Sequence, residues 1–141
     1  MSNLETVLPE WRQLRDASRQ VRANAWAPYS KYQVGAAILT DTGRVFAGCN
    51  VENASYGLTI CAERVAACSA VAQGFRKFVA VSVSLTGIPV PCGACRQFLN
   101  EFNPEMIVIF DDVTAPTDTI PEFMRLSELL PRAFRLEHEG L

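Results

Sequence analysis

The sequence predicts a single three-layer α/β domain, in which a mixed sheet of about five strands lies between helices. Short apolar runs of strand length alternate with helical segments along most of the chain. The length of 141 residues suits one domain, which we expect to span residues 1–141. Hydrophobic residues make up 49% and charged residues 20%, which is the balance of a soluble globular protein.

The first predicted element is an amphipathic helix from about Pro9 to Ala25. Apolar and small residues recur at spacings of three and four positions and form one face: Trp11, Leu14, Ser18, Val21 and Ala25. Arginines line a neighbouring face: Arg12, Arg15, Arg19 and Arg22. We expect this face to be solvated, because a net charge of −2 gives no general reason to bind nucleic acid.

A hairpin is predicted next. Strand-like runs at residues 34–40 and 45–51 are joined by residues 41–44, where Asp and Gly supply turn geometry. A loop at 53–59 leads to a helix from Cys61 to Gln73 that is rich in small residues. Such a helix packs closely, and from the sequence alone the sheet and a second subunit are equally good partners for it.

The second half of the chain continues the alternation. Residues 78–85 are almost continuously apolar, as expected for an interior strand that is covered on both faces. A helix is predicted at 92–102, and a further buried strand at 106–110. The tail is predicted to contain a loop at 111–121, an edge strand at 122–125 and a helical turn at 127–130.

Composition argues against membrane and secreted proteins. No apolar run approaches the length that spans a membrane, and the N-terminal residues lack the apolar core of a signal peptide. We therefore expect a cytoplasmic protein with no membrane partner. Five cysteines are an odd number, so metal binding or catalysis is favoured over a disulfide framework.

Two short motifs carry the predicted chemistry: Cys61-Ala62-Glu63-Arg64 and Pro91-Cys92-Gly93-Ala94-Cys95. Cys92 and Cys95 are three positions apart at the start of a helix, so both sulfurs can reach one ion, and Cys61 begins the other helix. Zinc held by three protein ligands keeps a fourth position for water. A carboxylate that does not bind the metal can move protons for that water, and we assign this role to Glu63.

Geometry sets a condition on this site. Residues two apart inside a helix point about 200° away from each other, so Cys61 and Glu63 converge only if Cys61 is the N-cap residue. The partial positive charge at both helix N-termini favours thiolates. Arg64 is predicted to donate hydrogen bonds to the sulfurs and so to withdraw more of their negative charge.

A closed structural zinc site is the alternative, and it needs a fourth ligand. Cys49 is the main candidate for that ligand. Cys68 lies two helical turns beyond Cys61, about 10 Å along the axis, which is too far. His138 is the single histidine and is predicted to be a solvated residue of the C-terminal tail.

The two motifs, in this three-cysteine form, resemble the cytidine deaminase family, specifically its short homotetrameric nucleoside deaminases. Four further stretches match the family in the right order: residues 27–37, 50–56, 95–97 and 129–134. The resemblance implies the three-layer α/β/α deaminase fold and one Zn²⁺ per subunit. It also implies hydrolysis of cytidine and deoxycytidine to uridine and deoxyuridine with release of ammonia, a reaction of pyrimidine salvage.

The resemblance also implies roles for individual residues. Glu63 would take a proton from the zinc-activated water, deliver it to N3 of cytosine and later protonate the leaving amine. Residues of the same subunit would hold the nucleoside: Tyr32, Asn50, Glu52 and Ala62. A neighbouring subunit would lend further contacts: Ala54, Tyr56 and Phe134. Two residues would hold the site residues in place without binding zinc or substrate themselves: Arg64 and Gln97.

Some of these roles have alternatives or departures. Asn50 and Glu52 are two apart at a strand end, where an amide and a carboxylate suit sugar hydroxyls, but an ordinary turn-forming pair explains them equally well. Phe134 could instead be a C-terminal core anchor. The family commonly has Phe in place of Tyr32 and often Gly in place of Arg132.

Two other functions share part of the pattern. A deaminase of another cytosine nucleoside, resembling blasticidin S deaminase, would have the same zinc motifs, but residues 50–56 favour a plain ribose. A non-catalytic zinc module that binds RNA or a protein is disfavoured by the net charge and by Glu63.

Overall fold

The computed structural model describes residues 3–138, which contain one five-stranded mixed sheet with the strand order β2-β1-β3-β4-β5. β1 is antiparallel to both β2 and β3, β3 is parallel to β4, and β4 is antiparallel to β5. This confirms the predicted sheet. The strands are β1 (Gly35–Thr40), β2 (Val45–Cys49), β3 (Phe78–Leu85), β4 (Ile107–Asp112) and β5 (Glu122–Arg125).

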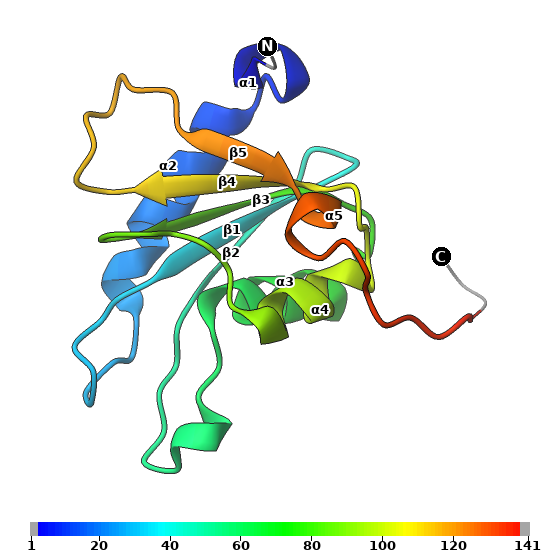
Figure 1. Ribbon diagram of the computed structural model, residues 1–141. Helices are drawn as coiled ribbons and strands as arrows, with labels where there is room; N and C mark the ends of the chain where they lie inside the picture. The colour runs from blue at the N-terminus through cyan, green and yellow to red at the C-terminus, as the bar shows by residue number, and fades with distance from the viewer. Residues whose placement is uncertain (1–2, 139–141) are drawn as a thin grey trace.

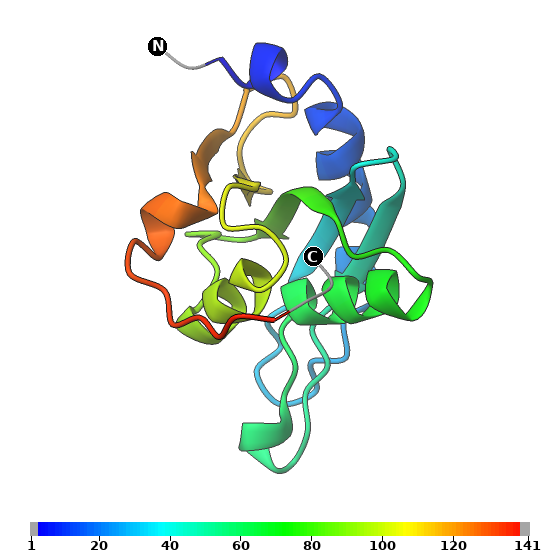
Figure 2. The ribbon, with the colours of Figure 1, turned by 90° about the vertical axis from the view of Figure 1, so that its right-hand side faces the viewer.

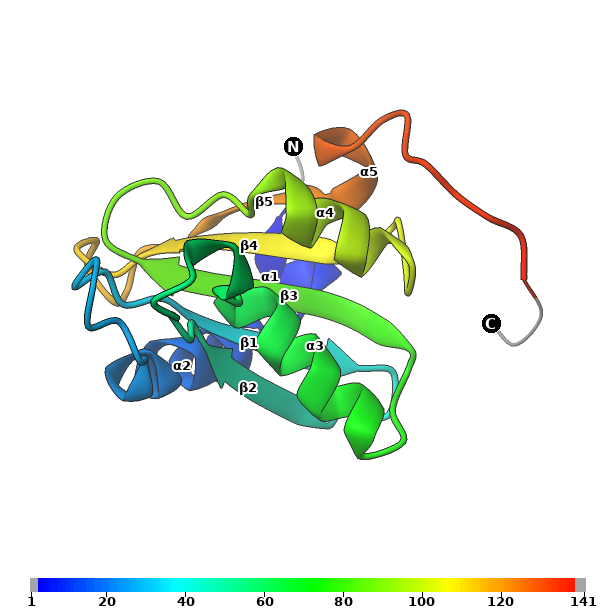
Figure 3. The ribbon, with the colours of Figure 1, turned by 90° about the horizontal axis from the view of Figure 1, so that it is seen from below.

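Helices cover both faces of the sheet. α2 (Trp11–Val21) lies on one face, and Figure 1 shows it behind the strands. α3 (Ala62–Ala72) and α4 (Gly93–Asn100) lie side by side on the opposite face, as Figure 3 shows from below. The three predicted layers are therefore present, with the sheet in the middle.

Each face of the sheet has its own hydrophobic core. The core beneath α2 includes Trp11, Leu14, Ala37, Leu39 and Ile109. The core beneath α3 and α4 includes Ile38, Ala66, Val81, Leu99 and Val108. Successive β1 residues alternate between the two cores, because side chains of a strand point to opposite faces in turn. All six residues of β1 are buried for this reason.

Shorter elements fill the connections. They are α1 (Leu4–Val7), α5 (Leu126–Leu129) and two 3₁₀ turns at Arg22–Asn24 and Tyr56–Leu58. The sequence does not predict α1, which is only one turn long. The helix predicted to reach Ala25 changes to the 3₁₀ turn after Val21. Within residues 3–138, no helix has the length and hydropathy needed to cross a membrane.

Two glycines at one end of the β1–β2 hairpin allow helices to pack close to the strands. A Cβ atom on Gly48 of β2 would lie 2.8 Å from the carbonyl oxygen of Ala62, and closer still to the nitrogen of Ala66. A Cβ atom on Gly35 of β1 would lie 2.9 Å from the nitrogen of Arg22. The small residues of α3 therefore pack against the sheet, which is one of the two partners considered for them.

The prediction of a solvated arginine face on α2 and the turn after it is wrong for three of its four residues. Arg15 is only 4% exposed and donates to the carbonyl oxygens of Thr117 and Thr119. Arg19 forms a bidentate pair with Asp111 at 2.7 Å, and Arg22 donates to Gln33 and Thr86. The acceptors come from distant parts of the chain, so the helix sequence alone does not reveal them.

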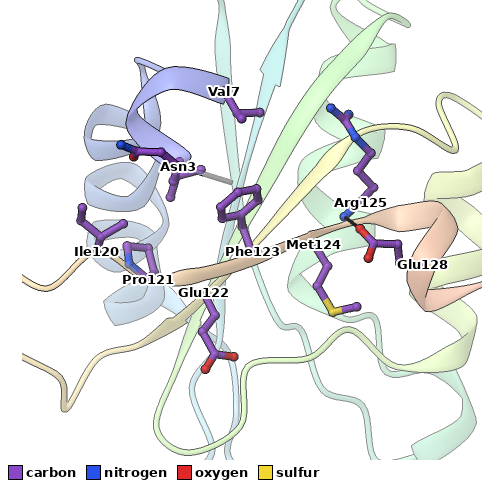
Figure 4. A pocket seen from close by; sticks show the side chains of 10 residues that line it. Asn3, Val7, Ile120, Pro121, Glu122, Phe123, Met124, Arg125 and Glu128 are labelled. Carbon is purple, nitrogen blue, oxygen red and sulfur yellow. Dashed lines mark hydrogen bonds between the residues drawn. The ribbon is translucent and has the colours of Figure 1, made fainter. Parts of the chain in front are cut away.

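A groove of about 780 Å³ lies beside the edge strand β5, where α1 forms one wall. Figure 4 shows Val7 and Phe123 on its two sides, and the backbone N–H of Arg125 donating to Glu128 at 3.0 Å. The residues that line this groove differ from those that the sequence predicts for the site. Volume alone therefore does not locate the chemistry in this chain.

Candidate active site

The three predicted ligand cysteines converge at the N-termini of α3 and α4. Their sulfur atoms lie within 4.8 Å of one another, with Cys61 and Cys92 at 3.9 Å. Zinc–sulfur bonds of about 2.3 Å in a tetrahedral site place sulfurs roughly 3.8 Å apart. The cluster therefore fits one zinc ion, as the sequence predicts.

Local backbone geometry explains this convergence. Cys61 and Cys92 are both N-cap residues with extended dihedral angles, φ −70° and ψ 152° for Cys61 and φ −66° and ψ 169° for Cys92. Cys95 lies in the first turn of α4 and is buried. The condition that Cys61 must be an N-cap residue is met.

Glu63 lies in the first turn of α3 and is only 4% exposed. Burial raises the pKa of Glu63 to about 7, and a backbone hydrogen bond opposes this shift without cancelling it. A carboxyl group with a pKa near neutrality can both accept and donate a proton under ordinary conditions. Its place in the first turn, two residues after the N-cap Cys61, sets it beside the cysteine cluster.

Arg64 contacts the cluster from α3. Its Nη2 donates to the sulfur of Cys61 at 3.4 Å, as predicted. The neighbouring Cys95 thiol lowers the pKa of Cys61 to about 5, and Arg64 contributes to the same shift. The neighbouring Cys61 also raises the pKa of Cys95, and burial acts in the same direction. A divalent cation between these sulfurs would favour their thiolate form.

The structure gives little support to a closed four-ligand site. Among residues 3–138, the group of three or more potential metal ligands is Cys61, Cys92 and Cys95 alone. Cys49 is not in this group, and Cys68 is exposed on α3. His138 is not simply solvated, because its Nε2 pairs with Glu101 at 2.7 Å.

Asn50 and Glu52 lie where two loops meet, after β2 and before β1. Asn50 is 8% exposed, and both ends of its amide bind backbone: Nδ2 donates to Tyr32 at 2.8 Å, and Oδ1 accepts from Val34 at 2.9 Å. Asn50 thus holds the chain in place, as the turn-forming alternative requires. One N–H and one lone pair of its amide remain for a ligand.

Glu52 is an acceptor at the edge of a cavity of about 380 Å³. Its carboxylate accepts from the backbone N–H groups of Tyr29 at 3.0 Å and Ser30 at 3.1 Å, and from the Ser30 hydroxyl. The hydroxyl bond is the main reason why the pKa of Glu52 is lowered. The cavity is lined by Tyr29, Ser30, Glu52, Asn53, Tyr56 and Thr59.

Tyr32 uses its hydroxyl within the protein. The hydroxyl donates to the carbonyl oxygen of Thr86 at 2.7 Å. Thr86 begins the segment that runs from β3 to Cys92. The hydroxyl that distinguishes this residue from the more usual Phe therefore has a partner in the chain, and the aromatic ring is half-exposed.

The residues expected to serve a neighbouring subunit lie on the surface. Tyr56 is 76% exposed and Phe134 is 68% exposed, so the alternative of Phe134 as a core anchor is wrong. Figure 2 shows the C-terminal tail running past α4 toward α3. Gln97 holds this tail, because its Nε2 donates to the carbonyl oxygen of Phe134 at 3.0 Å. Ala54 is also exposed.

The sequence pattern predicts no role for two residues that lie near the site. They are Ser30, which contacts Glu52, and Thr86, which contacts Tyr32. The signal for Ser30 is turn chemistry, since a serine two positions after Pro28 favours a side-chain-to-backbone turn. No comparable signal marks Thr86, because its contacts come from distant residues.

Metal ligands that leave a coordination position open, next to a buried carboxylate that can move protons, define a zinc-dependent hydrolase. Comparison with known proteins narrows this class. Residues 11–111 match the family described as the cytidine and deoxycytidylate deaminase zinc-binding region. The chain belongs to this family.

Similar proteins agree in sequence and in fold. The cytidine deaminase of Halalkalibacterium halodurans is 47% identical over 121 residues, covering 84% of this chain and 89% of the relative. That of Mycobacterium tuberculosis is 42% identical over 130 residues, covering 91% and 92%. The crystal structure of cytidine deaminase from Burkholderia pseudomallei superposes with a TM-score of 0.80 at 44% identity, covering 86% of this chain and 97% of that one. The predicted family and fold are confirmed.

Proposed function

We propose that this enzyme hydrolyses cytidine and 2′-deoxycytidine to uridine and 2′-deoxyuridine and releases ammonia, with one zinc ion per subunit. The observation that carries this proposal is the buried Glu63 beside three cysteines that fit zinc. Membership of the deaminase family supports the choice of reaction. The curated relatives described above are named cytidine deaminases, which supports the choice of nucleoside.

Zinc, when bound, supplies a Lewis acid that makes a water molecule more acidic and more nucleophilic. Glu63 would take a proton from this water as the water oxygen adds to C4 of the cytosine ring. Glu63 then delivers this proton to N3, takes the remaining proton from the oxygen now bonded to C4, and gives it to the amino group as the C4–N bond breaks and the C4 carbonyl forms. A pKa raised to about 7 suits a group that must act as base and then as acid.

Other residues of the chain hold the substrate in this proposal. Tyr32 and Ala62 lie beside the base, and Asn50 and Glu52 bind the ribose. Glu52 suits this role because a carboxylate with a lowered pKa is ionised and accepts hydrogen bonds from sugar hydroxyls. Arg64 draws charge from the Cys61 sulfur, and Gln97 holds the tail that carries Phe134.

We further propose a cytoplasmic homotetramer of a single-domain chain that serves pyrimidine salvage. Large apolar side chains are exposed on the loops beside Glu52 and on the tail: Trp26, Tyr29, Tyr56, Leu58 and Phe134. Exposed apolar groups of this size favour burial in a contact with another subunit. Ala54, Tyr56 and Phe134 would then complete the site of a neighbour.

The nucleoside assignment is tested by following ultraviolet absorbance over a panel of nucleosides with the zinc-loaded protein. We expect turnover of cytidine and deoxycytidine, and loss of turnover in Glu63→Gln. Glu105→Gln is the matched control, because Glu105 is exposed beyond the C-terminal end of α4. Turnover of other cytosine nucleosides without cytidine would instead support the blasticidin S type.

A non-catalytic zinc module is tested through its ligands. Zinc content per chain is measured in Cys61→Ser and Cys49→Ser. We expect Cys61→Ser to lose zinc and Cys49→Ser to keep it, because Cys49 lies outside the cluster. Loss of zinc in Cys49→Ser, together with full activity in Glu63→Gln, would favour the closed site.

A further inference from the structure

Ser30 lies in a turn that brings two proposed substrate contacts together. The turn is closed by a hydrogen bond from the backbone N–H of Lys31 to the carbonyl oxygen of Ala27 at 3.0 Å. Lys31 has φ 62°, in the left-handed region that side chains other than glycine rarely occupy. A conformation of this kind persists only where surrounding contacts determine it.

The side chain of Ser30 makes two of those contacts at once. Its hydroxyl donates to Oε2 of Glu52 and accepts from the backbone N–H of Tyr32 at 3.0 Å. Its backbone N–H also donates to Oε1 of Glu52 at 3.1 Å. Ser30 therefore links the Glu52 carboxylate on one loop to the backbone N–H of Tyr32 on the other.

The rest of Tyr32 is held as well. Its carbonyl oxygen accepts from Asn50 at 2.8 Å, and its hydroxyl donates to Thr86 at 2.7 Å. The Ser30 bond fixes the N–H group, so all three polar groups of Tyr32 have partners. The ring consequently has a defined position although it is half-exposed.

We propose that Ser30 is a positioning residue that holds the carboxylate of Glu52 and the ring of Tyr32 in the arrangement that binds the nucleoside. The inference rests on the proposed function, in which Glu52 contacts the ribose and Tyr32 lies beside the base. Ser30 itself does not touch the substrate. It acts by removing rotational freedom from Glu52 before the ribose arrives.

Removal of the hydroxyl has a defined consequence. In Ser30→Ala, Glu52 keeps its two bonds from backbone N–H groups at Oε1 but loses the bond at Oε2, and the N–H of Tyr32 loses its acceptor. We expect KM for cytidine to rise about fivefold, which corresponds to one hydrogen bond. We expect kcat to stay within about twofold, because the lost interaction orders the bound substrate and the transition state alike.

A double-mutant cycle separates this role from a general structural one. Steady-state kinetics are measured for the wild type, Ser30→Ala, Glu52→Gln and the double variant, all loaded with zinc. We expect Glu52→Gln to raise KM by at least about tenfold, since it replaces a charged acceptor. If Ser30 acts through Glu52, Ser30→Ala raises KM much less in the Glu52→Gln background than in the wild type. Additive effects on KM would overturn the inference.

Controls keep the result interpretable. Ser30→Thr retains a hydroxyl and is expected to restore most of the affinity. Ser127→Ala removes a hydroxyl that makes no hydrogen bond to the described residues, and is expected to leave KM unchanged. If Ser30→Ala melts below the assay temperature, the cycle is run with Ser30→Cys, whose thiol is a weak donor.

The possible failures are distinguishable. A wild type that does not turn over cytidine overturns the proposed function, and the inference with it. A wild type that is active, with a higher KM in Glu52→Gln and an unchanged KM in Ser30→Ala, overturns the inference alone. An unchanged KM in Glu52→Gln would show that Glu52 does not bind the ribose, and would also overturn the inference.

Discussion

The hydroxyl of Tyr32 donates to the carbonyl oxygen of Thr86 at 2.7 Å, and so joins the loop before β1 to the segment that leads to Cys92. Arg22 strengthens the junction, because its Nη2 donates to the Thr86 hydroxyl at 2.9 Å. Tyr32, which is proposed to lie beside the base, is thus hydrogen-bonded to the segment that leads to a metal ligand. Changes at Tyr32 should therefore separate the effect of the hydroxyl from that of the ring.

Tyr32→Phe is expected to keep turnover and to lower kcat/KM for cytidine about fivefold or less, which is the effect of one lost hydrogen bond. The ring stays, so the aromatic face is retained. Tyr32→Leu removes the face as well and should be clearly worse. Steady-state kinetics measure both, with zinc content as the check on Cys92. An increase in kcat/KM for Tyr32→Phe would contradict a positioning role for the hydroxyl.

Gly48→Ala is expected to destabilise the protein by about 3 kcal/mol, because the new Cβ atom would meet the backbone of α3. Since α3 carries Cys61 and Glu63, its displacement should also lower zinc content per chain. Urea unfolding of the zinc-free protein measures the free energy. Ala47→Ser is the control, because it adds one atom at the next position of β2, which is exposed. Equal stability of the two variants would mean that α3 can move away at little cost.

The close packing at Gly48 shows where sequence reasoning stops. The small residues of α3 predict a close contact, but the partner became clear only when the sheet register placed Gly48 opposite Ala36 and beneath Ala66. The cap position of Cys61 could be deduced, because the convergence of Cys61 and Glu63 requires it. Local periodicity and motif spacing thus predict elements and ligands well.

Contacts between distant segments could not be predicted in the same way. Arg15 and Arg19 look like surface residues in the helix pattern, yet their acceptors lie about a hundred positions further along the chain. The link from Ser30 to Glu52 is of the same kind, since it joins two loops that only the hairpin brings together. A single sequence does not show which loops will contact each other once the chain has folded.

Glu52 should titrate below the usual range for a glutamate, because the Ser30 hydroxyl and the N–H groups of Ser30 and Tyr29 stabilise its charged form. Lys31 acts in the same direction. A lowered pKa in the folded state means that this carboxylate stabilises the fold above its unfolded pKa, and that the contribution is lost as pH falls through the folded pKa.

Carbon-detected NMR of labelled glutamate side chains measures this pKa directly. In Ser30→Ala the pKa of Glu52 should rise toward the usual value, because the main cause of the shift is gone. The acid limb of cytidine binding should then move to higher pH. Other glutamates serve as internal references in the same spectra. A pKa of Glu52 that is unchanged in Ser30→Ala would show that the backbone bonds and Lys31 dominate.

Sharing of sites between subunits can be tested by complementation of two inactive variants. Phe134 is 68% exposed and Gln97 binds its backbone carbonyl oxygen, so Phe134→Ala should leave the melting temperature of each chain nearly unchanged. If Phe134 completes a neighbour's site, Phe134→Ala should lower kcat/KM more than about tenfold, as loss of a buried aromatic contact does. Glu63→Gln should be inactive because it lacks the carboxylate that transfers protons.

Mixed tetramers of these two variants should regain activity. A subunit with Glu63→Gln still offers an intact Phe134 to the site of a Phe134→Ala subunit, which still has Glu63. The variants are mixed, partly unfolded, refolded together with zinc and assayed against each variant treated alone. Recovery to roughly a quarter of wild-type kcat/KM is expected if subunits combine at random and each site draws on one neighbour's Phe134. Activity equal to the average of the separate variants would mean that Phe134 acts within its own chain.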